Sequence, residues 1–183
     1  MTGLVGLLLA AGLIIWSIFT YNLLIKCKNL VSEAWSGIDV QLKRRADLIP
    51  NLVEAVKGYK QFERKTLEEV TSLRAKSVSA EAVKDKVDSE NAISRALKSI
   101  FAVAEAYPDL KASRSFLDLH KNLVEIEDQL QMARRYYNGA VRDYNILTQS
   151  FPSNLIAGAC RFGNSEFFEI EYATERQAPE VKL

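Results

Sequence analysis

Histidine and cysteine are scarce in this chain, and their scarcity excludes several kinds of catalytic site. Among 183 residues there is one histidine, His120, and there are two cysteines, Cys27 and Cys160. A Ser/His nucleophilic site needs a base beside the nucleophile, and His120 lies on a charged and polar part of its segment, where a solvated position is expected. A di-iron bundle needs Glu-x-x-His on two helices, but Leu117 lies three residues before the single histidine.

Several binding motifs are absent as well. The chain has no Gly-x-x-x-x-Gly-Lys, no Gly-x-Gly-x-x-Gly and no Cys-x-x-Cys sequence, which are the patterns that bind phosphates, dinucleotides and redox or metal centres. Its formal net charge of +1 leaves neither a basic face for nucleic acid nor an acidic tail. We therefore expect no enzymatic activity, no cofactor or metal, no nucleic-acid partner and no small-molecule substrate.

Charge is absent from the beginning of the chain. The first charged side chain is Lys26, so the run from Gly3 to Ile25 is uncharged and exceeds the roughly 20 apolar residues that a membrane-spanning helix needs. A cleaved signal peptide is the alternative, but it would need a charged n-region and a clear cleavage site. The sequence predicts a transmembrane anchor over residues 1–27, with Trp16 and Tyr21 as interfacial side chains.

Basic residues follow the anchor and set its orientation. Lys26, Lys28, Lys43, Arg44 and Arg45 lie within about 20 residues of its downstream end, the range in which the positive-inside bias acts. We expect the N-terminus outside and the rest of the chain in the cytoplasm. The juxtamembrane Cys27 is then either palmitoylated or a plain reduced thiol.

Glycine and proline are rare after the anchor, and the pattern between them is helical. The clearest helix spans about residues 112–150, where apolar positions recur at alternate spacings of three and four. This seam predicts packing against antiparallel helices in a bundle over residues 28–150. Its members are Phe116, Leu119, Leu123, Ile126, Leu130, Ala133, Tyr137, Ala140, Tyr144 and Leu147.

Pro50 admits two interpretations. It either follows a turn and begins a new helix, where its missing N–H costs nothing, or lies inside one continuous helix. The phase of Ile38, Leu42, Ile49 and Leu52 favours continuity, although Arg45 interrupts the stripe.

Two polar clusters flank the apolar stripes. The first contains Asp39, Lys43, Arg44, Arg45 and Asp47, with Asp39 and Lys43 at the i,i+4 spacing of a helical ion pair. It is either an ordinary solvated surface or a surface that binds a partner. The second, between Arg134 and Asn145, is expected to be a solvated face.

These stretches resemble the bacterial LemA family over essentially the whole chain. The resemblance is carried by IDVQLKRRADLIPNLVE at residues 38–54, AEAYPDLKA at 104–112, ARRYYN at 133–138, VRDYN at 141–145, FPSNLIAG at 151–158 and EFFE at 166–169. It implies an all-α protein in the bacterial cytoplasmic membrane, with an anchor and a cytoplasmic, antiparallel up-and-down four-helix bundle. It favours the turn at Pro50. It also implies no established enzymatic activity, and one branch of the family is associated with magnetosome membranes.

Two functional hypotheses follow. The first is a scaffold that self-associates and shapes or organises the membrane, since small residues such as Gly3 and Gly6 allow close approach of transmembrane helices. The second is an adaptor, or a component of an envelope-stress response, whose bundle binds another membrane protein such as a protease or kinase.

The segment after residue 150 is unusually apolar before a polar tail, Glu169 to Leu183. If four helices alternate in direction, the fourth returns to the membrane, and this segment lies near the bilayer. Its side chains then either cap the bundle core or form an interfacial foot, with Arg161 at anionic lipid. The residues of this foot are Leu155, Ile156, Arg161, Phe162, Phe167 and Phe168.

Overall fold

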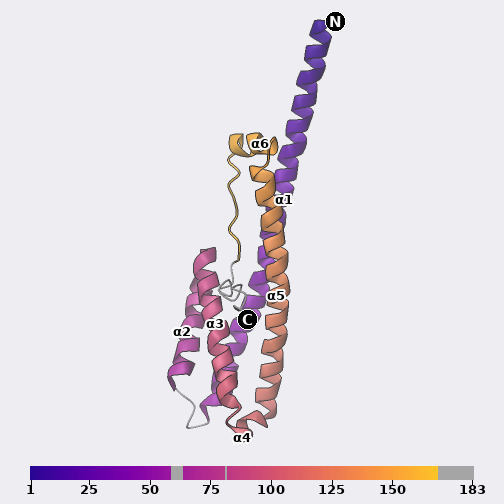
Figure 1. Ribbon diagram of the computed structural model, residues 1–183. Helices are drawn as coiled ribbons and strands as arrows, with labels where there is room; N and C mark the ends of the chain where they lie inside the picture. Colours follow the sequence, from indigo (N-terminus) through magenta and orange to yellow (C-terminus); the bar gives the residue numbers. More distant parts are fainter. Residues whose placement is uncertain (59–63, 81, 169–183) are drawn as a thin grey trace, which may run out of the picture. The chain divides into compact units, whose positions relative to one another are not determined.

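The computed structural model describes residues 1–58, 64–80 and 82–168, and all regular structure in these ranges is helical. The helices in this part of the chain are α1 (Thr2–Lys57), α2 (Arg64–Ser79), α3 (Val83–Ala104), α4 (Pro108–Lys111), α5 (Arg114–Gln149) and α6 (Ser153–Ala159) (Figure 1). The predicted all-α class is confirmed. The up-and-down four-helix arrangement stays a prediction, and the predicted polar tail lies outside the described residues.

The chain divides into two compact units that share α1 and α5. The first unit contains Met1–Ile38 and Ala133–Phe167, and the second contains Asp39–Met132 and Phe168–Leu183. The boundaries predicted after residues 27 and 150, which divide the anchor, the bundle and the C-terminal segment, stay a prediction.

The first unit brings α1 against the end of α5. The rings of Trp35 and Tyr137 meet edge-on with centroids 5.3 Å apart, and Tyr21 lies 5.7 Å from Phe162 in the same geometry. Phe162 comes later in the chain than Tyr137, but its partner Tyr21 comes earlier in α1 than Trp35. The two segments therefore run in opposite directions. The seam residues Tyr137, Ala140 and Tyr144 are buried, as the spacing predicts.

The second unit has an apolar core to which five of the described helices contribute. The end of α1, α2, α3 and the start of α5 contribute, and α4 adds Leu110 between α3 and α5. Each segment buries one stripe at intervals of three and four residues, as expected for amphipathic helices. The core residues are Ile49, Leu52, Val56, Leu67, Val70, Ile93, Ala96, Leu97, Ile100, Ala104, Leu110, Phe116 and Leu123.

Pro50 lies inside α1, so the turn that the family resemblance implies is wrong and the phase argument is right. A proline has no N–H to donate to the carbonyl four residues earlier, which here belongs to Ala46. Arg74 of α2 supplies the missing donor, because its Nε lies 2.6 Å from the Ala46 oxygen. The break between the first two soluble segments therefore comes after Lys57 and not at Pro50.

Candidate functional site

The N-terminal part of α1 presents apolar side chains all round. Its length and composition suffice to cross a membrane, and none of its most apolar stretch is buried. Among the anchor residues, Tyr21, Lys26 and Lys28 are exposed, while Trp16 is half-buried. A helix that is apolar on every face is ordinarily enclosed by a large core or by lipid. The exposed large side chains are Leu4, Val5, Leu7, Leu8, Leu9, Leu13, Ile14, Ile15, Ile18 and Phe19.

Phe162 lies against the downstream end of this apolar surface. Its ring meets that of Tyr21, and the ammonium of Lys28 lies 5.9 Å from the ring centroid, within the range of a cation–π contact. The segment that follows α6 is therefore packed where the apolar run gives way to charged residues.

Hydrogen bonds fix this segment to α5. The side-chain amide of Asn145 donates to the carbonyl of Ser165 and accepts from its N–H, each over 2.9 Å. The hydroxyl of Tyr137 donates to the carbonyl of Glu166 over 2.8 Å, and that of Thr148 lies 3.0 Å from Oδ1 of Asn164. Burial and the negative charge of Glu166 raise the pKa of Tyr137, so the phenol stays protonated and able to donate.

The α6 helix ends in a Schellman motif. The N–H of Phe162 donates to the carbonyl of Ala157 and that of Arg161 to Gly158, and Arg161 occupies the left-handed region with φ 58°. Glycine is the usual residue at this position because a side chain there costs roughly 1 kcal/mol. An arginine at a position that favours glycine points to a role for its side chain.

The structure divides the six residues of the predicted foot. Leu155, Arg161 and Phe167 are exposed, while Ile156 and Phe162 are half-buried. Phe168 is only 1% exposed; its inclusion among lipid-facing side chains is wrong, because a ring enclosed by protein cannot insert into a bilayer.

Arg45, predicted to lie on a partner-binding surface, is buried in the second unit at 1% exposure. Its guanidinium pairs with the carboxylate of Glu90 and lies 2.7 Å from Oε2 of Glu127. It also donates to the hydroxyl of Ser94 over 2.8 Å, and Ser77 donates to the other oxygen of Glu90. We call these five residues the Arg45 network. Its ion pairs and hydrogen bonds compensate the charge of the Arg45 guanidinium, which water cannot reach.

The rest of that predicted surface is accessible. Lys43, Arg44 and Asp47 are exposed. The observed ion pair of Asp39 is with Lys86 of α3 at 2.6 Å and not with the expected Lys43, because α3 packs beside this part of α1.

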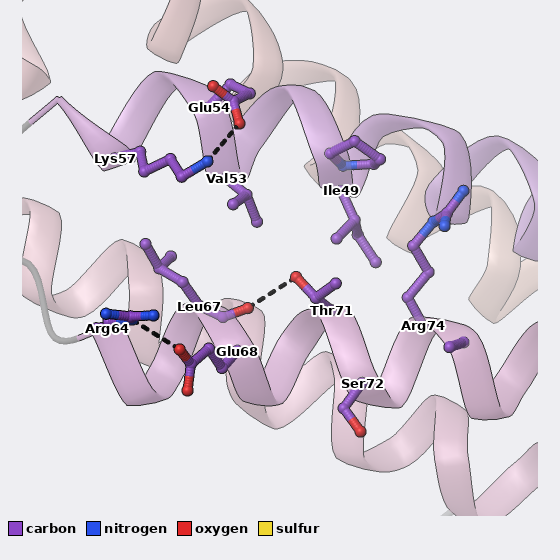
Figure 2. A pocket seen from close by; sticks show the side chains of 12 residues that line it. Ile49, Val53, Glu54, Lys57, Arg64, Leu67, Glu68, Thr71, Ser72 and Arg74 are labelled. Atoms are coloured by element: carbon purple, nitrogen blue, oxygen red, sulfur yellow. Dashed lines mark hydrogen bonds and ion pairs between the residues drawn. The ribbon is translucent and has the colours of Figure 1, made fainter.

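A groove lies between the end of α1 and α2 (Figure 2). Its volume is about 940 Å³, and apolar side chains such as Ile49, Val53 and Leu67 line it. Four of the charged residues that line it pair along their own helices, Lys57 with Glu54 at 2.9 Å and Arg64 with Glu68 at 2.8 Å, and Arg74 donates to the carbonyl of Ala46. The groove therefore offers an apolar surface rather than a charged or nucleophilic site.

His120 is half-buried and not fully solvated as predicted. Its ring lies 4.3 Å from that of Phe101 and stacks on Phe116 at 6.5 Å. In residues 1–58, 64–80 and 82–168, no group of three or more His, Cys, Asp or Glu side chains is placed to hold a metal ion.

The hydrogen bonds between α5 and the segment after α6 do not follow from the sequence pattern. That pattern predicts a solvated face for Asn145 and only a seam position for Tyr137. The signal available was a polar pair, Asn145 and Thr148, at i,i+3 spacing beside the seam. The partner of Asn145 lies 20 residues later and that of Thr148 lies 16 residues later. Helical periodicity does not encode such separations.

Comparison with known proteins gives consistent matches. The model of the LemA family matches residues 34–183. The chain is 30% identical to Protein LemA of Metamycoplasma hominis over 155 residues, which cover 81% of this chain and 68% of that protein. It is 23% identical to Magnetosome protein MamQ 2 of Paramagnetospirillum magneticum and 22% identical to MamQ of Magnetospirillum gryphiswaldense. Both matches cover 81% of this chain but 64% of the MamQ protein, just under two thirds.

Proposed function

The chain belongs to the LemA family, and on this basis we propose that it is a single-pass, non-enzymatic membrane scaffold. In this proposal it self-associates and organises or shapes the bacterial cytoplasmic membrane. The N-terminus lies outside, and residues 26–183 lie in the cytoplasm.

One observation carries the proposal: the N-terminal part of α1 exposes large apolar side chains on every face. Burial of a Leu or Ile side chain is favourable by roughly 1.5–3 kcal/mol relative to full exposure to water. Lipid recovers this energy without any further protein, so a bilayer is the environment that this helix fits.

Self-association is supported by the small residues of the anchor. A Cβ built on Gly3 or Gly6 would meet nothing within 4 Å, so this face is open to a second helix. Small residues let transmembrane helices approach one another closely. The MamQ relatives are magnetosome proteins, which supports a role in membrane organisation.

Native mass spectrometry of the full chain in a mild detergent tests self-association. We expect oligomers whose population rises with concentration, and Gly6→Leu should raise the concentration needed by on the order of tenfold. The matched control is Leu8→Ile, about 200° around the helix from Gly6. Monomers at every concentration would rule out a self-associating scaffold.

The groove of Figure 2 favours a second candidate, an adaptor that binds another membrane protein. An apolar groove between two helices is a common binding site for a partner helix. Liposomes distinguish the two functions, because a scaffold deforms or clusters them alone and an adaptor requires its partner. Crosslinking in native membranes followed by mass spectrometry would then identify the adaptor's partner.

A further inference from the structure

We propose that residues 151–162, comprising α6 and its C-terminal cap, lie in the headgroup region of an anionic membrane surface. This stretch is called the foot below. The inference rests on the proposed function, because it requires that α1 crosses a bilayer.

The first argument is the level of the foot along α1. Phe162 contacts both Tyr21 and Lys28, which are seven residues apart and so about 10 Å apart along the helix axis. This interval contains the change from apolar to charged sequence. The side chains that hold Phe162 are therefore an aromatic and a lysine at the end of the span, where such residues favour the interface.

The second argument is the chemistry of the exposed surface. From Phe151 to Cys160 the chain carries no charged side chain, yet Phe151 is 80% and Leu155 59% exposed. The buried positions Ser153 and Ala157 face the protein. Large exposed apolar groups beside a transmembrane span are suited to shallow insertion among lipids.

The third argument is rigidity, because a loosely held segment could not keep these groups at a fixed depth. The hydroxyl of Ser153 lies 2.7 Å from the carbonyl of Leu147 and 2.9 Å from that of Ser150. On the other side of the foot, Asn145 holds both backbone groups of Ser165. The foot is thus held near its start by Ser153, and the chain three residues beyond its end is held to α5 by Asn145.

The fourth argument is charge, and it selects an anionic lipid surface. Lys26, Lys28 and Arg161 are all exposed around the foot. The nearby acid Asp143 is paired with Arg142 at 3.0 Å. A guanidinium forms bidentate hydrogen bonds with phosphate, so Arg161 is placed to bind a lipid headgroup.

The depth of Cys160 in a bilayer tests the position of the foot. The full chain with Cys27→Ser leaves Cys160, which is exposed, as the single site for a nitroxide label. In nanodiscs of phosphatidylcholine and phosphatidylglycerol, power-saturation electron paramagnetic resonance compares collisions with oxygen and with a water-soluble nickel complex. On a background with Cys27→Ser and Cys160→Ser, two reference labels come from Ile14→Cys in the anchor and Ser99→Cys on α3.

We expect the label at Cys160 to report a depth between those of the two references. If Cys160 matches Ser99 while Ile14 lies in lipid, the foot is wrong and the anchor stands. A label at Ile14 that stays in water overturns the anchor and, with it, the foot. A label at Cys160 that collides with neither oxygen nor the nickel complex would show that protein covers the segment, which also overturns the proposal.

Substitution of Arg161 tests the preference for anionic lipid without risk to the fold, since glycine accepts φ 58° freely. We expect the thermal midpoint of the native chain to be higher in anionic than in neutral nanodiscs. Arg161→Gly should lose most of this difference, and Arg161→Lys should keep most of it. If Arg161→Gly keeps the full difference, the contact between Arg161 and a headgroup is overturned.

Discussion

Arg45 contributes to the stability of the second unit from a buried position, although its side chain is charged. Arg45 is a charged side chain at a position that helical phase assigns to the core, and it is buried there. The desolvation cost of such a group is several kcal/mol, offset only by well-placed partners. The guanidinium has as partners two carboxylates, the hydroxyl of Ser94 and, at 3.3 Å, the carbonyl of Glu90, while the hydroxyl of Ser77 donates to the Glu90 carboxylate.

Removal of Arg45 alone should therefore be severe. We expect Arg45→Met to lower the free energy of unfolding by about 3–5 kcal/mol, because it leaves the carboxylate of Glu90 buried without its guanidinium. Arg45→Met with Glu90→Met should recover most of the loss. The neighbouring exposed Arg44 provides the matched control, and Arg44→Met should change stability by less than about 0.5 kcal/mol. Denaturant titration of the full chain in detergent, followed by circular dichroism, measures all three variants.

Arg74 and Pro50 should show energetic coupling. Arg74→Met leaves the Ala46 carbonyl without its donor and should cost about 1–3 kcal/mol. In a Pro50→Ala background the new N–H can donate to that carbonyl, so the same substitution should cost less. A double-mutant cycle measures the difference, with Arg64→Met, at an exposed ion pair of the same helix, as the control. Strict additivity would contradict this account of Pro50.

At the scale of elements, the segment after α6 has no regular structure up to residue 168 and is nevertheless well anchored. Its stability comes from side chains of α5 that pair with its backbone, in the manner of a short strand pairing. Asn145 is suited to this task because a primary amide presents one donor and one acceptor in the geometry of a peptide group.

Asn145→Ala should release this segment while α5 remains helical. We expect the amide of Ser165 to exchange with solvent about tenfold faster, which corresponds to the loss of roughly one net hydrogen bond. Hydrogen–deuterium exchange with mass spectrometry on the full chain measures the protection of residues 160–167. Arg142→Ala on the same helix is the control and should leave the exchange unchanged. Equal exchange in the Asn145 and Arg142 variants would show that Asn145 does not hold the segment.

At the scale of the whole molecule, the decisive property is the direction in which the chain enters the membrane. The proposed orientation rests on basic residues on one side of the span. We expect a reporter fused after Leu183 to behave as cytoplasmic. Protease added to cells with a permeabilised outer envelope should leave residues 26–183 intact. Digestion of this region would contradict the positive-inside argument.

Much of the fold could be predicted because local periodicity determines it. The seam on α5 and the stripe through Val31, Ala34, Ile38 and Leu42 are predicted from the spacing of apolar residues, and both are buried or half-buried in the structure. Pro50 shows the limit of that method. Phase predicts continuity, but only a donor from another helix explains how the proline is accommodated.

The Arg45 network and the bonds of Asn145 could not be predicted, because their partners are distant in sequence. Arg45 bonds to residues 45 to 82 positions away. In the sequence a charged residue within a polar cluster is indistinguishable from a solvated one. Only the packing of several helices shows that the same side chain is enclosed.

The Arg45 network also has a consequence for how the second unit assembles. Its members come from four helices, with Arg45 on α1, Ser77 on α2, Glu90 and Ser94 on α3, and Glu127 on α5. Any assembly of only two or three of these helices would enclose a charge or hydroxyl without all its partners, at a cost of about 1–3 kcal/mol per missing bond. Partial structures are thereby disfavoured, and we expect the helices of this unit to form cooperatively. During synthesis, the earlier helices gain their full stability only when α5 has been made.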